Sequence, residues 1–425
     1  MFELVLTLII YVLYVVYWRR RQVAHERRLR AYSIRVHVNG TRGKSTVTRL
    51  IAGVLGEAGY RTLAKTTGSA AVTINFDGED TPVRRRGPAN VKEQQDIIAD
   101  WEPQGAEAMV VECMALQPKY QEWTEKMALR AHIGVITNVR EDHQDVMGET
   151  LPKIAASLAH MCPAYGALIT AEYDPDLQAV LRREAERRGS RLIVADPAWV
   201  SEDELARFDY LAFKDNVAIG LAVADLFGID RETAMRGMIK AKGDIGVVRL
   251  QRVTLRGKPV TWANLFAVND RESMIISMQV LEAHCDDQTI KIGILNNRYD
   301  RERRAMQFGD VAAKDLSFDW LITFGAYEDL VTRRLIGNGY PRERIVNLGF
   351  SVNPGIEQII DAIASIIPDG YPAMLVGFVN IHTPQAEMLM EYFEQLTASQ
   401  VEIAAYADEA GYLRRQRFEM AHLSV

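Results

Sequence analysis

The segment VNGTRGKST, residues 38–46, constrains the fold of this chain more than any other stretch of its sequence. The apolar run SIRVHV before it, residues 33–38, predicts a buried strand. Residues 45–58 after it carry apolar side chains at the spacing of one helix face. A glycine-rich turn between a strand and a helix aims backbone N–H groups and the positive helix end at one point. We therefore predict a phosphate-binding loop, with a glycine-rich turn that binds nothing as the alternative.

Each residue type in this loop has an expected task. Lys44 is expected to reach the β- and γ-phosphates of a nucleotide, and the Ser45 hydroxyl to ligate Mg²⁺. The loop departs from the full G-x-x-x-x-G-K-[ST] signature at one place, because Val38 stands where that signature has its first glycine. The expected nucleotide-binding residues of the loop are Asn39, Gly40, Thr41, Arg42, Gly43, Lys44, Ser45 and Thr46.

Strand-like and helix-like segments alternate after residue 33, which predicts an α/β fold built on parallel sheets. A chain of 425 residues is long enough for two such domains. The pattern stops around residues 243–246 and then begins again, so we expect a domain boundary near residue 246. The expected strands are 33–38, 108–112, 132–137, 166–170 and 191–196 in the first domain, and 247–255 and 259–265 in the second.

The N-terminal segment differs from the rest of the chain. Residues 4–18 carry no charge, and six arginines follow between residues 19 and 30. This run is slightly shorter than the roughly 20 residues that cross a bilayer, but interfacial aromatics and snorkelling arginines extend its reach. The charge bias predicts one membrane helix with its C-terminal end in the cytoplasm. A buried core helix is the alternative, whereas a cleaved signal peptide carries its positive charge before the apolar run.

Aromatic residues recur at helical spacing within this apolar run. Tyr11, Tyr14 and the pair Tyr17 and Trp18 fall on one side of a helix. Tyrosine hydroxyls inside a bilayer need partners that lipid tails lack, so we expect contacts with membrane-embedded partner subunits. An interfacial aromatic belt is the alternative. The expected organisation is a transmembrane anchor at 1–18, a basic juxtamembrane segment at 19–32, an ATPase domain at 33–246, a smaller α/β domain at 247–397 and a tail at 398–425.

The composition is that of an ordinary globular chain, with 48% hydrophobic and 25% charged residues. The net charge of −6 argues against a protein that coats nucleic acid, and we expect no nucleic-acid partner. Cys113, Cys162 and Cys285 cannot all pair and lack metal-ligand spacing. A reducing, cytoplasmic setting is therefore expected for the folded part.

Two further segments follow predicted strands, where open α/β sheets place their sites. Glu112 closes the strand AMVVE, and His143 lies in TNVREDHQDVMG, residues 137–148. Together with the compressed loop G-T-x-G-K-[ST]-T, these segments resemble the Mur-ligase superfamily, whose members join an amino acid to a carboxylate with ATP. The resemblance implies Lys44, Glu112 and His143 as catalytic residues, and Ser45, Glu112 and His143 as magnesium ligands. Taken without the rest of the motif, His143 is better interpreted as a surface histidine, and an exposed strand end is the alternative for Glu112.

The second domain carries two weaker matches to this superfamily. FAVNDRES, residues 266–273, stands in place of an A-H-N-P segment and keeps only its asparagine, Asn269. NNRYDRERRAMQF, residues 296–308, resembles a D-R-D-x-x-x-R segment. The resemblance implies that Asp300 accepts hydrogen bonds from ribose and that Arg298 or Arg301 faces phosphate. A charged helix start on the solvent is the alternative.

A closer resemblance covers nearly the whole chain. The runs VNGTRGKSTVTRLIAGVLGEAGYRTLAKTTG, ECMALQPKYQ, IGVITNVREDHQDVMG and VNIH are similar to the ligase subunits of poly-γ-glutamate synthases (PgsB/CapB type). This implies glutamate and a growing polyglutamate chain as substrates, ATP and Mg²⁺ as cofactors, and tethering at the cell membrane. The basic residues 84–86 would guide the acidic polymer or form an ordinary solvated loop. A folylpolyglutamate synthase-like ligase and a membrane-tethered P-loop NTPase that drives a partner are the alternatives.

Overall fold

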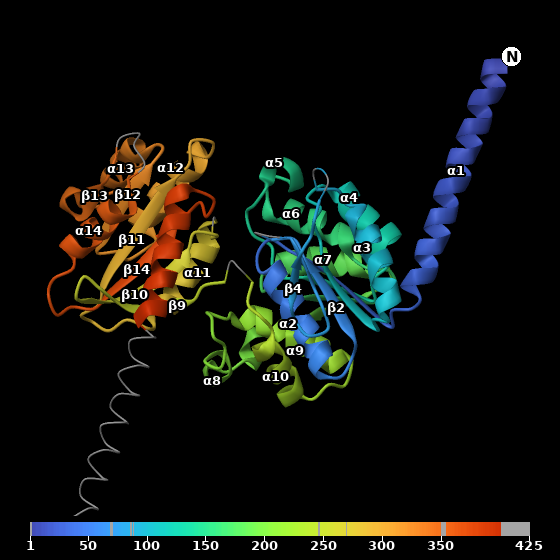
Figure 1. The fold of residues 1–425 in the computed structure, drawn as a ribbon, viewed down its shortest axis with the longest axis horizontal. Coiled ribbons are helices and arrows are strands. Elements are labelled where there is room, and N and C mark those ends of the chain that lie inside the picture. The colour runs from blue at the N-terminus through green and yellow to red at the C-terminus, as the bar shows by residue number, and fades with distance from the viewer. Residues whose placement is uncertain are drawn as a thin grey trace, which may run out of the picture. The chain divides into compact units, whose positions relative to one another are not determined.

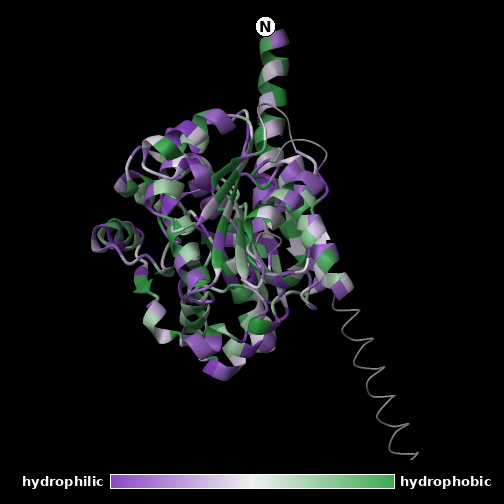
Figure 2. Ribbon diagram, turned by 90° about the vertical axis from the view of Figure 1, so that its left-hand side faces the viewer, coloured by the Kyte–Doolittle hydropathy of each residue, from purple (hydrophilic) through white to green (hydrophobic). Residues whose placement is uncertain are grey.

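The computed structural model describes residues 2–68, 71–85, 87, 89–244, 247–268, 270–349 and 354–400. The chain divides into two compact units, Met1–Val247 (unit 1) and Val248–Val425 (unit 2). Each unit is a largely parallel sheet covered by helices, so the predicted α/β class is confirmed (Figure 1). In Figure 2 the strands are mostly hydrophobic and the outer helix faces mostly hydrophilic, as burial of the sheets requires.

Unit 1 contains an eight-stranded sheet in the order β4-β3-β2-β5-β1-β6-β7-β8. All neighbours are parallel except β2–β3 and β3–β4, which are antiparallel. The sequence pattern missed β2, β3 and β4, because two of them are three residues long and β2 buries a charged side chain, Lys65. The strands are β1 Ile34–Asn39, β2 Thr62–Thr66, β3 Val72–Ile74, β4 Asp80–Pro82, β5 Ala108–Glu112, β6 Ile133–Ile136, β7 Ala167–Thr170 and β8 Arg191–Val194.

The helix after the phosphate loop, α2 (Lys44–Glu57), packs against α9 (Lys214–Leu226) and α10 (Arg231–Lys240). Gly53 of α2 and Gly237 of α10 face each other so closely that a Cβ on either would meet the other's carbonyl oxygen at 2.3 Å. The remaining helices of unit 1 are α3 Glu93–Trp101, α4 Pro118–Trp123, α5 Gln144–Met147, α6 Leu151–Leu158, α7 Pro175–Arg187 and α8 Glu202–Leu205, with a π-helical turn at Thr124–Leu129 and 3₁₀ turns at Glu102–Gln104, Ala159–Met161 and Pro197–Trp199.

The N-terminal helix α1 (Phe2–Leu29) is longer than the expected anchor. It continues without a break through most of the basic segment, and its last turns bury His25 and Leu29 against the rest of unit 1. Its apolar part is exposed, and the helix is long and apolar enough to cross a membrane by length and composition. The apolar part of α1 and the rest of unit 1 are therefore joined by a continuous helix rather than by a linker.

The described part of unit 2 contains a six-stranded sheet in the order β13-β12-β11-β14-β10-β9, in which only the β9–β10 pairing is antiparallel. Trp262 stacks on Phe393 in its core, with ring centroids 4.6 Å apart. The strands are β9 Leu250–Leu255, β10 Lys258–Leu265, β11 Ile290–Asn297, β12 Trp320–Gly325, β13 Ile345–Asn347 and β14 Ala373–Phe378; the helices are α11 Arg271–Glu282, α12 Glu302–Lys314, α13 Glu328–Gly337, α14 Ile356–Ile366 and residues 384–400, with a 3₁₀ turn at Arg342–Arg344.

Candidate active site

The loop between β1 and α2 needs glycine at two positions. Gly40 has a φ of 131°, and a Cβ there would lie 2.0 Å from Oγ1 of Thr137. Gly43, with a φ of 77°, caps α2 without a side-chain hydrogen bond to the first turn. The first N–H groups of a helix have no partner inside it, and no cap residue covers them here. The loop therefore offers backbone donors and a positive helix end to an anion.

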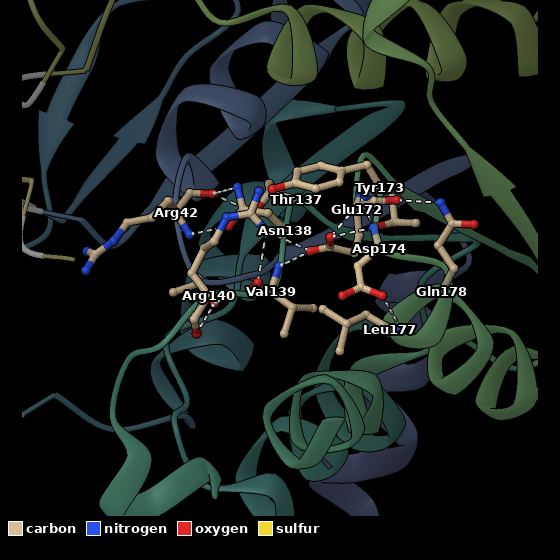
Figure 3. Close-up of polar contacts among 12 residues, drawn as sticks. Arg42, Thr137, Asn138, Val139, Arg140, Glu172, Tyr173, Asp174, Leu177 and Gln178 are labelled. Carbon is tan, nitrogen blue, oxygen red and sulfur yellow. Dashed lines mark hydrogen bonds and ion pairs between the residues drawn. The ribbon is translucent and has the colours of Figure 1, made fainter. Parts of the chain in front are cut away.

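The segment after β6 holds this loop in place. Asn138 accepts hydrogen bonds from the Thr41 backbone N–H at 3.1 Å, through its carbonyl oxygen, and from the Arg42 N–H at 3.0 Å, through Oδ1. The Thr137 hydroxyl donates to the Arg42 carbonyl oxygen at 2.6 Å (Figure 3). The first residues of the T-N-x-x-x-D-H motif thus shape the phosphate loop, a task that the sequence pattern did not reveal.

A buried carboxylate supports the same segment from β7. Glu172 accepts hydrogen bonds from the Val139 N–H at 2.8 Å and from Nη1 of Arg140 at 2.9 Å (Figure 3). Its side chain is fully buried and that of Arg140 nearly so. Glu172 was not predicted, because the sequence shows it only as one acid after a strand.

Glu112 lies at the end of β5, next to the loop. Its Oε2 accepts hydrogen bonds from the Ser45 hydroxyl at 2.8 Å and from the Thr67 N–H at 2.7 Å. A Cβ on Gly68 would come within 2.5 Å of Ser45 Oγ, so this approach requires glycine. Gln94 donates to the Glu112 carbonyl oxygen at 3.1 Å. Thr67, Gly68 and Gln94 were missed, although the run TTG after a buried strand was a usable signal.

Lys44 is half-buried at the start of α2, and its ammonium group is held by the loop itself. Nζ donates to the carbonyl oxygens of Gly40 at 2.8 Å and Thr41 at 3.1 Å. Burial lowers the pKa of Lys44, while the nearby carboxylate of Glu112 acts in the opposite direction. The structure therefore brings Lys44, Ser45 and Glu112 together around the loop.

His143 lies on the loop after β6, at the same edge of the sheet. It precedes α5 with a φ of 43°, and its side chain is 46% exposed. Its Nε2 lies 3.8 Å from Oδ1 of Asp142, whose Oδ2 lies 3.4 Å from Nη2 of Arg42. Within the described residues His143 forms no hydrogen bond with Ser45 or Glu112. Its role as a metal ligand stays a prediction.

The donor set at Ser45 and Glu112 fits a magnesium ion. A hydroxyl and a carboxylate are oxygen ligands of the kind that Mg²⁺ prefers, and Mg²⁺ commonly binds one or two protein groups plus phosphates and water. Over the described ranges no group of three or more His, Cys, Asp or Glu side chains could hold a metal. In that part of the chain, the structure therefore does not indicate a metal site made of protein ligands alone.

Three candidate residues of unit 2, Arg298, Asp300 and Arg301, lie between β11 and α12. Arg298 binds Asp300 through two hydrogen bonds, of 3.0 and 2.9 Å, and Nε of Arg301 lies 3.6 Å from the same carboxylate. A ribose would compete with Arg298 for Asp300.

Asn269 and Arg86 lie outside the described residues. Beside this segment Asn296 donates to the Thr383 hydroxyl, a buried polar contact that sequence reasoning did not predict.

Comparisons with known proteins agree with this geometry. Residues 38–205 match the Mur ligase middle domain, and residues 250–396 match the poly-gamma-glutamate synthase CapB C-terminal domain. Folylpolyglutamate synthase of Mycobacterium tuberculosis, solved with ADP and AMPPCP, has the same fold at a TM-score of 0.61 and 16% identity, covering 87% of this chain and 94% of that one. These matches define the class, an ATP-dependent amide ligase of the Mur type.

Two curated relatives narrow the assignment. The capsule biosynthesis protein CapB of Bacillus anthracis is 37% identical over 92% of this chain and 83% of its own length. The PGA synthase CapB of Bacillus subtilis (strain 168) is 35% identical over 87% of this chain and 93% of its own. The chain belongs to the CapB family, as the sequence resemblance predicted.

Proposed function

We propose that this enzyme polymerises glutamate into poly-γ-glutamate at the cytoplasmic face of the membrane, through an acyl phosphate. The observation that carries the proposal is the cluster of Lys44, Ser45 and Glu112 around a glycine-dependent phosphate loop. The matches to CapB proteins, one of them named a PGA synthase, support the substrate.

The chemistry needs charge stabilisation more than it needs a nucleophile from the protein. A carboxylate oxygen of the growing chain attacks the γ-phosphorus of ATP, the bond to the bridging oxygen breaks, and ADP leaves. The amine of the next glutamate then attacks the acyl carbon, loses a proton and displaces phosphate. The loop N–H groups and the Lys44 ammonium group bind the phosphates and stabilise the negative charge that spreads over them during transfer.

Ser45, Glu112 and His143 would hold magnesium in this scheme. When bound, the metal would supply positive charge that offsets the negative charge of the reacting oxygens. The hydrogen bond from the Thr67 N–H orients Glu112 toward Ser45, and Gly68 keeps the space beside Ser45 open. Asn269, Arg298, Asp300 and Arg301 of unit 2 are proposed to bind the nucleotide.

We propose that α1 anchors the chain in the membrane as a single span, with both catalytic domains in the cytoplasm and partner subunits around the span. The proposed bounds are 1–18 for the anchor, 19–32 for the basic segment, 33–246 and 247–397 for the domains, and 398–425 for the tail. Deletion of residues 2–18, with fractionation of cells that express all subunits, tests this part. Membrane-bound truncated protein with unchanged polymer output would refute both the anchor and its partner role.

The catalytic part is tested by ADP release from membranes that contain the enzyme. D-glutamate, L-glutamate or neither is added, and we expect release to depend on one enantiomer and to parallel polymer formation. ADP release that ignores glutamate would instead favour an NTPase that drives a partner. Release that requires a folate substrate would favour a folylpolyglutamate synthase-like ligase. The dihydrofolate synthase/folylpolyglutamate synthase of Bacillus subtilis (strain 168) is a weaker relative, with 26% identity over 44% of this chain.

A further inference from the structure

Trp18, which ends the apolar part of α1, lies between two cations from different parts of the chain. Its ring centroid is 5.4 Å from the guanidinium carbon of Arg21 and 4.6 Å from Nζ of Lys92. Lys92 directly precedes α3, and Figure 1 shows α1 leaving unit 1 on the side of α3. Tryptophan at the end of an apolar span sits at headgroup depth. A residue of the ATPase unit therefore lies at the level where the span would meet the membrane surface.

Buried contacts fix this arrangement. Nε2 of His25 lies 2.7 Å from the Ala128 carbonyl oxygen, and His25 is only 2% exposed. The Met127 carbonyl oxygen accepts hydrogen bonds from Gln22 of α1 at 3.1 Å and from Gln95 of α3 at 2.9 Å. One carbonyl joins both helices, so α1 cannot swing away from α3 without breaking these part-buried hydrogen bonds and leaving the buried His25 unpaired.

The charges around this junction do not balance. Three acidic side chains each have a basic partner, in the pairs Asp96 with Arg21, Glu102 with Arg28, and Glu26 with Arg130. Beside Trp18, three exposed cations have no acidic partner among the described residues, namely Arg19, Arg20 and Lys92. Arg27 and Arg30, farther along the chain, are exposed and form no ion pair in the described part either. An excess of positive charge thus remains at the end of the apolar run.

We propose that Arg19, Arg20 and Lys92 bind the anionic headgroups of phospholipids and so hold unit 1 against the membrane surface. This inference rests on the proposed membrane anchoring. A basic residue near an anionic membrane strengthens association about fivefold, the equivalent of about 1 kcal/mol. Arg27 is exposed on the same helix but lies roughly 13 Å beyond Trp18 at 1.5 Å per residue. That distance exceeds the screening length of about 8 Å, so Arg27 is a matched control.

The test uses the full chain in nanodiscs of phosphatidylcholine that contain spin-labelled phosphatidylglycerol or phosphatidylcholine. Electron paramagnetic resonance measures how strongly the protein selects the anionic lipid. We expect selectivity in the wild type, a decrease of about fivefold for Lys92→Gln, and a larger decrease when Arg19→Gln and Arg20→Gln are combined. Lys92→Arg and Arg27→Gln should keep the wild-type selectivity.

Unchanged selectivity in Lys92→Gln would overturn the proposal, because unit 1 would then not touch the headgroups. An equal decrease for Arg27→Gln would overturn it as well, since charge anywhere on the helix would suffice. No selectivity in the wild type would assign the three cations to another partner, such as a protein subunit. Carbonate extraction separates these outcomes from failure of the anchor, because an unanchored chain would be released from membranes.

Discussion

The Ser45 hydroxyl donates a hydrogen bond of 2.8 Å to Oε2 of Glu112, across the neighbouring parallel strands β1 and β5. The register of these strands places Val38 beside Glu112, so the start of the phosphate loop and the carboxylate reach the same sheet edge. Two of the proposed magnesium ligands, Ser45 and Glu112, are thus brought together by the sheet even though they are far apart in sequence.

Glu112→Gln should weaken the use of magnesium. The amide keeps the shape of the side chain but loses the negative charge, so the magnesium concentration for half-maximal ATP turnover should rise roughly tenfold or more. High magnesium should restore part of the rate. Glu125→Gln is the control, because Glu125 is equally buried but pairs with His37. Unchanged metal dependence in Glu112→Gln would remove Glu112 from the site.

His143→Ala should shift the magnesium dependence in the same direction without changing the stability of the fold. The side chain is 46% exposed and precedes α5, so its removal leaves no cavity in the core. Turnover at several magnesium concentrations and the thermal unfolding midpoint are the two measurements. A normal magnesium profile would show that His143 is a surface residue of the loop.

Lys44→Ala should reduce ATP turnover and polymer formation by about a hundredfold or more, because the transferred charge loses its ammonium partner. The fold should persist, since among the described residues Lys44 hydrogen-bonds only to carbonyl oxygens of its own loop. Lys240→Ala is the control, because Lys240 pairs with Glu57 at the other end of α2. ADP release by purified Lys44→Ala at the wild-type rate would refute the site.

Gly40→Ala should abolish nucleotide binding. The new Cβ would collide with Oγ1 of Thr137 at 2.0 Å, and a φ of 131° is unfavourable for alanine. Gly56→Ala lies in the same loop–helix segment, has open space around its Cβ, and should stabilise α2 by up to about 1 kcal/mol. Binding of a fluorescent ATP analogue distinguishes the two variants. Equal affinity of the two variants for the ATP analogue would mean that nucleotide binding does not need this loop geometry.

The buried pair of His37 and Glu125 should make stability depend on pH. Nδ1 of His37 lies 2.9 Å from Oε2 of Glu125. Burial lowers the pKa of His37, but the neighbouring Cys113 and Glu125 side chains outweigh burial and raise the pKa to about 9. Protonated His37 therefore stabilises the fold fully below the ordinary value of 6.5. The contribution, about 3 kcal/mol, should disappear as the pH rises through 9.

Thermal unfolding midpoints of the full chain in detergent, measured at pH 6.5 and above pH 9, check this expectation. His37→Gln should unfold at a lower temperature near neutral pH and lose much of the decrease at high pH. The same decrease in wild type and variant would assign the pH dependence to other groups.

Local patterns in the sequence were enough to predict the α/β class, the strand–loop–helix arrangement around residues 38–46, five of the eight described strands of the first sheet and two of the six described strands of the second. They succeed where neighbouring residues share one role, as in the glycines between β1 and α2 or the apolar face of α2. They fail for β2, where the fully buried Lys65 interrupts the apolar run while pairing with Glu93 at 3.1 Å.

Contacts between distant segments were decided by the tertiary structure alone. Spacing cannot show that Thr67 and Gln94 bond to Glu112, because those contacts depend on how β2, β5 and α3 pack. The same holds for the contact between Lys92 and Trp18, because the sequence pattern assigns Lys92 to the ATPase domain and Trp18 to the anchor. The chain by itself determined which local elements form and which residue types carry phosphate chemistry. The packing of those elements determined which side chains meet, because burial and strand register act across the whole sheet.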